Sequence, residues 1–271
     1  MFAVGLKLIA LDIDGTLIPP AQYGNGDLLP SPRVVEAVRR LQSAGVVVVV
    51  ASGRMFPGTA LIARSLGLEG PVICQQGCSV HSMDGGTLHL FPIERQPALS
   101  IVDYARELDH PYEWFNPVRY IVSRRVAAAE EYGRVSGIEP EYLDRPEDAG
   151  VAPTGVGIIS SPEEASAIHS HLAGLHGEAL HLLDFPTVTV AVDANANKGH
   201  SLTLICDDLR ISRADTLAVG DSVNDASMLA WAGRGIAMPH SDRYALDAAD
   251  EVLAEDDADP LAALLEQLAL G

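Results

Sequence analysis

Nearly continuous runs of apolar, mostly β-branched residues alternate with helix-forming segments toward both ends of the chain. Such runs are typical of strands in a parallel sheet whose two faces are both covered. They lie at residues 6–11, 46–50, 72–74 and 216–219. The alternation of strands with helices predicts an α/β fold with right-handed crossover connections.

The helices of this pattern carry start and stop signals. Ser31 suits an N-cap, Pro32 suits the first helical position, and Gly45 follows the last turn. Valine and leucine recur between them at helical spacing, which indicates one buried face. Further helices are expected at 57–66, 198–209, 226–231 and after Pro260, with a strand at 235–238.

The middle of the chain has a different pattern, in which pairs of strands alternate with helices. Strands are expected at 112–115, 120–123, 156–159, 179–183 and 188–192, helices at 98–108, 126–135 and 162–175, a hairpin turn at 84–86, and a loop at 139–153. This arrangement predicts an α+β domain with an antiparallel sheet. We therefore expect a Rossmann-like α/β core with a central parallel sheet, formed by residues 1–83 and 193–271, and an inserted α+β cap domain at 84–192.

Charge and cysteine content narrow the possible partners. The chain has 271 residues, and 18 Lys plus Arg against 37 Asp plus Glu give a formal charge of −19, which repels nucleic acid and anionic membrane. A phosphate site in such a chain needs its own positive charge, for which a metal ion is a source. No signal-peptide pattern, bilayer-spanning stretch or disulfide framework is evident, so we expect a soluble cytoplasmic protein with Cys74 and Cys78 as buried thiols.

Two carboxylates follow the first strand. Asp12 and Asp14 stand where open α/β sheets place their ligands, and Gly15 permits a backbone turn that aims both at one place. A lone Asp-x-Asp pair would be better explained by ordinary capping in a loop. The flanking strand and the Gly15-Thr16 turn favour a functional site.

Three further strand or helix ends carry polar residues. Ser52-Gly53-Arg54 follows the second strand, where a hydroxyl and a glycine amide suit phosphate oxygens. Lys198 opens a helix, against the usual dipole preference, unless an anion binds there. Asp221, Asn224 and Asp225 follow another buried strand. Carboxylate oxygens close to a phosphate site favour Mg²⁺ as the cofactor.

Together these segments resemble the four motifs of the haloacid dehalogenase superfamily of phosphohydrolases. The matching segments are Asp12-x-Asp14-Gly15-Thr16-Leu17, Ser52-Gly53-Arg54, Lys198-Gly199 and Gly220-Asp221-Ser222-x-Asn224-Asp225. Their order, their spacing and the cap between the second and third motifs are similar to the Cof-type, sugar-phosphatase-like branch. The resemblance covers essentially the whole chain.

The resemblance implies a role for each matched residue. Asp12 would attack phosphorus and form a phosphoaspartyl intermediate, while Asp14 would protonate the leaving oxygen and then activate water. Mg²⁺ would be held by Asp12, the Asp14 backbone carbonyl and Asp221, with Asp225 either binding the ion directly or orienting its other ligands. The phosphoryl oxygens would be bound by the Ile13 amide, Ser52, Lys198 and Asn224. Arg54 either reaches the substrate or forms a structural ion pair.

The implied activity is Mg²⁺-dependent hydrolysis of small phosphorylated metabolites such as sugar phosphates. A phosphomutase or phosphotransferase would use the same intermediate, and a non-catalytic phosphometabolite sensor is a third, less favoured reading. Two segments depart from the family pattern, Gln76-Gly77-Cys78 and Pro239-His240-Ser241. We expect both to line the mouth of the pocket and to affect substrate identity.

Several cap residues also stand out. Metal sites require convergent geometry, and His169 and His171 point to different faces of one helix. We therefore expect surface roles for these histidines and for His176 and His181. Trp114, Phe115 and Tyr120 are expected to pack within the cap, with room for one of them to face the active site. A cap of about 110 residues can close over the site and exclude macromolecules.

Overall fold

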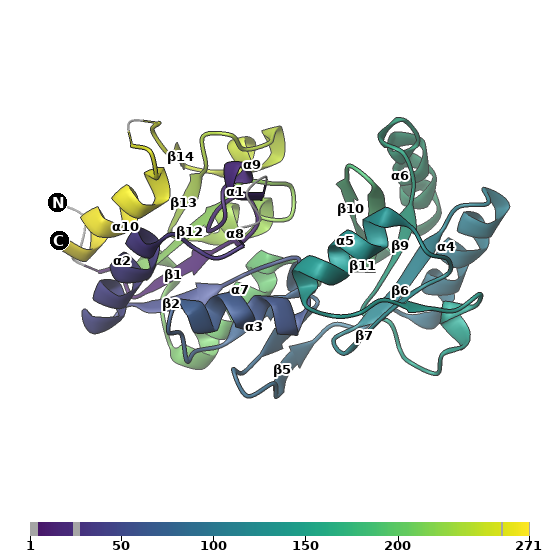
Figure 1. Cartoon of the computed structure of the whole chain (residues 1–271), viewed down its shortest axis with the longest axis horizontal. Coiled ribbons are helices and arrows are strands. Elements are labelled where there is room, and N and C mark those ends of the chain that lie inside the picture. The colour runs from purple at the N-terminus through teal and green to yellow at the C-terminus, as the bar shows by residue number, and fades with distance from the viewer. Residues whose placement is uncertain (1–4, 24–27, 256, 271) are drawn as a thin grey trace.

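The computed structural model describes residues 5–23, 28–255 and 257–270. Its central sheet has the order β14-β13-β12-β1-β2, and all neighbouring strands are parallel (Figure 1). The strands are β1 (Leu8–Leu11), β2 (Val47–Val50), β12 (Thr216–Gly220), β13 (Arg234–Ala237) and β14 (Glu251–Val252). The predicted α/β fold with a central parallel sheet is confirmed.

Helices cover both faces of this sheet because successive strand residues point to opposite sides. Ile9 and Leu11 pack with α2 (Pro32–Ser43), α3 (Phe56–Ser65) and α10 (Pro260–Leu270). Leu8 and Ala10 pack with α7 (Lys198–Leu209), α8 (Ala226–Trp231) and α9 (Arg243–Ala248). Apart from α9 and the short α1 (Pro20–Tyr23), these helices are those that the sequence predicts.

The strand expected at 72–74 pairs differently from the prediction. It forms as β3 (Val72–Cys74) and is fully buried, but it belongs to an antiparallel sheet with β4 (Ser79–His81) and β5 (Thr87–Leu90). An isolated parallel bridge between Ile73 and Ala51, the residue that follows β2, connects β3 to the end of the central sheet. The cause is the 3₁₀ turn Gln75–Gly77, which reverses the chain so that β4 returns along β3. The turn at 84–86 joins β4 to β5 as predicted.

The middle of the chain forms a second sheet with the order β10-β11-β9-β6-β7-β8, antiparallel except between β7 and β8. Its strands are β6 (Tyr112–Asn116), β7 (Arg119–Val122), β8 (Glu141–Tyr142), β9 (Gly155–Ile159), β10 (Leu180–Phe185) and β11 (Val188–Asp193). Helices α4 (Arg95–Glu107) and α6 (Pro162–His176) pack on one face, and α5 (Ala127–Ser136) packs on the other. The loop expected at 139–153 contains β8 and a short 3₁₀ turn, Pro146–Asp148.

Helix α5 joins the cap sheet to the core. A Cβ at Gly58 on α3 would lie 2.4 Å from the backbone oxygen of Val135, so only glycine allows these two helices to approach so closely. The Met55 amide donates to Ser136 Oγ at 3.2 Å, and the Tyr132 hydroxyl donates to the Gly53 carbonyl at 3.1 Å. The two lobes therefore meet beside the carboxyl ends of the central strands (Figure 1).

The cap limits at residues 84 and 192 remain a prediction. Among the helices that the structure describes, none combines the length and the apolar character needed to cross a bilayer.

Candidate active site

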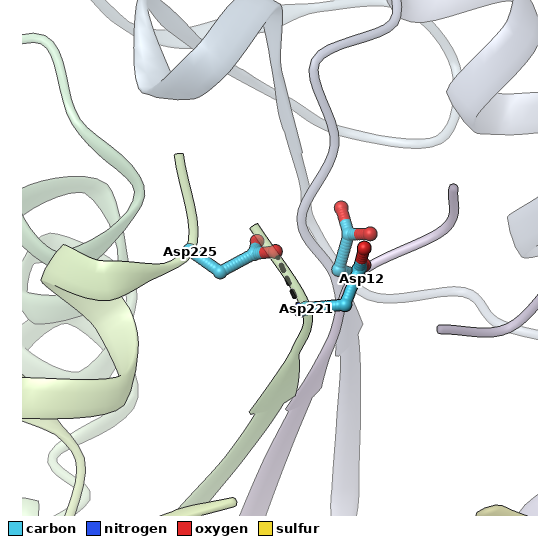
Figure 2. Close-up of side chains that lie close together, drawn as sticks. All are labelled: Asp12, Asp221 and Asp225. Atoms are coloured by element: carbon cyan, nitrogen blue, oxygen red, sulfur yellow. Dashed lines mark hydrogen bonds between the residues drawn. The ribbon is translucent and has the colours of Figure 1, made fainter. Parts of the chain in front are cut away.

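The two central strands of the core sheet each deliver a carboxylate to the same edge. Asp12 directly follows β1, Asp221 directly follows the neighbouring β12, and the Asp12 amide donates to the Val219 carbonyl at 3.1 Å. Asp225 approaches from the loop before α8, and its Oδ2 accepts the Asp221 amide at 2.9 Å (Figure 2). The same oxygen accepts the Ser222 amide at 3.0 Å. These two bonds fold the loop back so that Asp225 faces the strand ends.

Lys198 lies beneath this carboxylate group. It is fully buried, and its Nζ donates to Asp12 Oδ1 and to Asp225 Oδ1, at 2.6 Å in each case. Burial alone would lower the pKa of Lys198, but the two carboxylates more than offset this effect and raise it above its ordinary value. The ammonium therefore stays charged and orients both carboxylates.

One ammonium does not balance the carboxylates gathered here. Burial, followed by the Asp225 charge, raises the pKa of Asp12 well above its usual range, and the same causes raise that of Asp221 to about 7. Asp12, Asp221 and Asp225 each offer an oxygen within 4.8 Å of the others. An all-oxygen set with excess negative charge fits a hard divalent cation such as Mg²⁺. The Asp14 carboxylate is not part of this group of three. The prediction that Asp14 binds Mg²⁺ therefore concerns its backbone carbonyl alone.

Gly15 is required by the close approach of Asp221. Its φ is +98°, and a Cβ there would lie 2.2 Å from Asp221 Oδ2. Thr16 Oγ1 donates to Asp221 Oδ1 at 3.2 Å from the same turn. His240 Nε2 lies 2.7 Å from the Gly15 carbonyl, which only accepts, so Nε2 carries the proton. The Asp12–Thr16 turn is thus held against the β12 loop.

The polar residues that follow β2 are already paired within the protein. Ser52 is fully buried, and its Oγ accepts the Arg54 amide at 3.1 Å. Arg54 is 3% exposed, and its guanidinium donates to both oxygens of Asp14, at 2.8 and 2.6 Å. Arg54 was expected either to reach the substrate or to form a structural ion pair, and the structure contains the ion pair. Arg54 also lines the cavity between the core and the cap.

A cavity of about 440 Å³ lies between the strand ends and the cap sheet. Of the predicted site residues it is lined by Asp12, Asp14, Gly53, Arg54, Asp221 and Asn224. Lys198 and Asp225 do not line the cavity. Lys198 reaches it through its hydrogen bond to Asp12, and Asp225 is bonded to Lys198. Ser52 and Ile13 do not line the cavity either; the Ile13 side chain packs in the core, and the prediction for it concerns its backbone amide.

Gln76 is a site residue whose contacts the sequence did not reveal. Gln75 and Gln76 both have positive φ, at 52° and 63°, a strained conformation that tends to occur at functional sites. The side-chain oxygen Oε1 of Gln76 accepts from Asn224 Nδ2 at 2.5 Å, and a Cβ on Gly53 would lie 2.5 Å from Gln76 Nε2. The expectation that this segment lines the pocket is confirmed for Gln76. For the second segment, Pro239-His240-Ser241, the same expectation is wrong for His240, which does not line the cavity and faces the Gly15 carbonyl instead.

The cap histidines have separate partners. His169 lies 2.8 Å from Asp184, His171 stacks on Tyr104, His176 bonds Ser100, and His181 faces the Ala196 carbonyl. The aromatic residues divide by strand alternation. Trp114 packs toward α4 and α6, as predicted, whereas Phe115 and Tyr120 line the cavity.

Sequence and structure comparisons agree with this arrangement. The family model for haloacid dehalogenase-like hydrolases matches residues 9–265. Phosphatase YwpJ of Bacillus subtilis is 27% identical over 97% of this chain and 100% of its own length. A putative phosphatase of Haemophilus influenzae is 25% identical over 87% of this chain and 86% of its own.

Solved structures share the fold over nearly the whole chain. A haloacid dehalogenase-like hydrolase from Bacteroides thetaiotaomicron has a TM-score of 0.82 at 21% identity, covering 97% of this chain and 99% of its own. A structure described as a subclass IIB sugar phosphatase has a TM-score of 0.80 at 17% identity, covering 98% and 100%. At these identities the likeness establishes the fold alone. The family match, together with the two relatives named as phosphatases, shows that the chain belongs to the haloacid dehalogenase-like hydrolase family and is a phosphatase of that family.

Proposed function

We propose that the protein is a Mg²⁺-dependent phosphatase that hydrolyses small phosphorylated metabolites through a phosphoaspartyl intermediate on Asp12. The observation that carries the proposal is the buried contact between Asp12 and Lys198, at 2.6 Å beside Asp221 and Asp225. This contact keeps a carboxylate oriented at the floor of the cavity between the core and the cap sheet. Sugar phosphates belong to this substrate class, and one relative of the same fold is described as a sugar phosphatase.

In the first step an Asp12 oxygen attacks phosphorus, the bond from phosphorus to the leaving oxygen breaks, and Asp14 transfers a proton to that oxygen. In the second step Asp14 takes a proton from water, whose oxygen attacks phosphorus and releases Asp12 and inorganic phosphate. A bound Mg²⁺, held by Asp12, Asp221 and Asp225, would supply positive charge for the phosphoryl oxygens.

The ion pair between Arg54 and Asp14 bears directly on this sequence. Both Asp14 oxygens accept hydrogen bonds from Arg54, so a protonated Asp14 requires that one of them be released. We expect substrate entry to open the pair, after which Arg54 can bind a phosphate oxygen in the manner usual for a guanidinium.

The test is phosphate release by Asp12→Asn, with Asp84→Asn at an exposed turn as the matched control. We expect the first variant to lose activity by at least about 10⁴-fold, as for removal of other catalytic nucleophiles, and the control to match the wild type. EDTA should abolish wild-type turnover, and acid quenching should trap a hydroxylamine-sensitive phosphoryl group on Asp12. Undiminished activity of Asp12→Asn would refute the mechanism. Transfer to an added alcohol in preference to water would instead indicate a phosphotransferase.

A further inference from the structure

Glu113 is a buried carboxyl group in the roof of the active-site cavity. It is 6% exposed, stands on β6 and lines the same cavity as Asp12 and Asp14. Strand alternation directs it to the face of the cap sheet that also carries Phe115, away from Tyr112 and its neighbours packed under α4 and α6. A buried carboxyl group in a cavity is costly unless it has a partner, so its position calls for an explanation.

The residues around Glu113 hold it in place and leave one oxygen available. The Tyr120 hydroxyl donates to Glu113 Oε2 at 2.6 Å. On the paired strand a Cβ at Gly157 would lie 2.5 Å from Oε1, so the glycine provides the space that the carboxyl group occupies. Within the described part of the chain, Oε1 accepts no hydrogen bond. Burial raises the pKa of Glu113 to about 7, as expected for a carboxyl group without a cationic partner.

Most of the roof around this group is apolar. It is formed by side chains from five cap elements, namely Phe115, Val135, Ile159, Phe185, Val188 and Val190. The two tyrosine hydroxyls in the lining already donate, Tyr120 to Glu113 and Tyr132 to the Gly53 carbonyl. The other carboxylate in the roof, Glu131, is exposed and paired with Arg134 at 2.6 Å.

This lining suits some phosphorylated metabolites better than others. Each hydroxyl of a hexose that is buried without a partner costs about 1–3 kcal/mol, which corresponds to roughly 5- to 150-fold in affinity. An apolar, ring-sized body instead gains from contact with the roof. A single donor at the end away from the phosphate can reach the free oxygen of Glu113.

We propose that the preferred substrate is a phosphate monoester whose leaving group has an apolar, ring-sized body and one distal hydrogen-bond donor, and that Glu113 binds that donor. This inference rests on the proposed phosphatase activity. Ammonium and hydroxyl groups share the required chemistry. Glu113 is accordingly a specificity residue that recognises the leaving group, while Asp12 and Asp14 carry out the reaction.

Three matched substrates test the inference with the full chain in Mg²⁺: benzyl phosphate, 4-(hydroxymethyl)benzyl phosphate and 4-(aminomethyl)benzyl phosphate, compared with glucose 6-phosphate. At pH 8, where Glu113 is mostly charged, we expect kcat/KM for at least one donor-bearing ester to exceed that for benzyl phosphate by about tenfold, because a hydrogen bond to a charged acceptor is worth that much. Preference for the amine over the alcohol would identify an ammonium ligand, and the reverse a hydroxyl ligand. Glucose 6-phosphate should be the poorest of the four.

Glu113→Gln keeps the shape of the side chain and should bring the ratio between donor-bearing ester and benzyl phosphate close to one. The matched control is Glu147→Gln, since Glu147 is also a buried cap glutamate bonded by a tyrosine hydroxyl, from Tyr112 at 2.9 Å, but it does not line the cavity. That control should leave the ratio unchanged.

Glucose 6-phosphate turned over as efficiently as the benzyl esters would overturn the inference, as would an unchanged ratio in Glu113→Gln. The comparison of substrates in the wild type needs no variant to fold. Absence of phosphate release from all four esters and from 4-nitrophenyl phosphate would instead count against the proposed function itself.

Discussion

Replacement of Lys198 by Met tests how strongly the active site depends on one buried cation. At an effective dielectric constant of about 20, unit charges 2.6 Å apart attract with about 6 kcal/mol, and Lys198 has two such contacts, with Asp12 and Asp225. The cost of burying the ammonium offsets much of this attraction. Measured losses on breaking buried pairs are about 3–5 kcal/mol, so we expect Lys198→Met to lower the free energy of unfolding by that amount in EDTA.

The assay is urea denaturation followed by tryptophan fluorescence, with Lys7→Met as the matched control. Lys7 makes an ion pair of similar length with Asp215, at 2.7 Å, but its side chain is 59% exposed. Exposed pairs contribute at most about 1 kcal/mol. Mg²⁺ should restore part of the stability of Lys198→Met, because a cation bound at 100 times its Kd adds about 2.7 kcal/mol. A loss no larger than that of Lys7→Met would refute the reasoning.

Two further predictions concern backbone space and pH. Gly15→Ala should reduce activity at least about 100-fold, because its Cβ would lie 2.2 Å from Asp221 Oδ2. The control is Gly45→Ala, where φ is also positive, at +86°, but no atom lies within 4 Å of the added Cβ. This control should cost about 1 kcal/mol of stability and leave kcat unchanged. Equal activity losses in the two variants would contradict the role of close approach. Glu113 has a pKa raised to about 7 from the ordinary 4.5, so the folded state binds a proton that the unfolded state releases, and stability falls as pH rises between these values. Relative to Glu113→Gln, the wild type should lose about 3 kcal/mol over this range, measured by urea midpoints from pH 4.5 to 8; parallel stability curves for the two proteins would contradict this.

Where the sequence predicted the fold well, the signals were local. The helix α2 begins after the expected cap, since Ser31 accepts the Val34 amide at 3.2 Å, and Pro32 is its first residue. Apolar runs predicted the central strands because both faces of a parallel sheet are buried. The pairing of β3 could not be obtained in this way, because it depends on a reversal at Gln75–Gly77 that glutamines do not normally indicate.

The sequence by itself determined which carboxylates follow the central strands, because parallel strands must end at a common edge. The structure brings Asp12 and Asp221 together there, with Lys198 arriving from 186 residues away. The contacts among these three residues follow from the order of the strands in the sheet, so the sequence motifs were enough to predict them.

Only the tertiary structure decided what surrounds those carboxylates. Three features of the site depend on how separate elements pack against one another. They are the ion pair between Arg54 and Asp14, the hydrogen bond between Gln76 and Asn224, and the position of Glu113 in the cavity lining. Strand periodicity places Glu113 and Phe115 on one face of β6, but it does not say whether that face meets helices or the active site. The docking of α5 against α3 at Gly58 settles this, because it turns the apolar face of the cap sheet toward the strand ends.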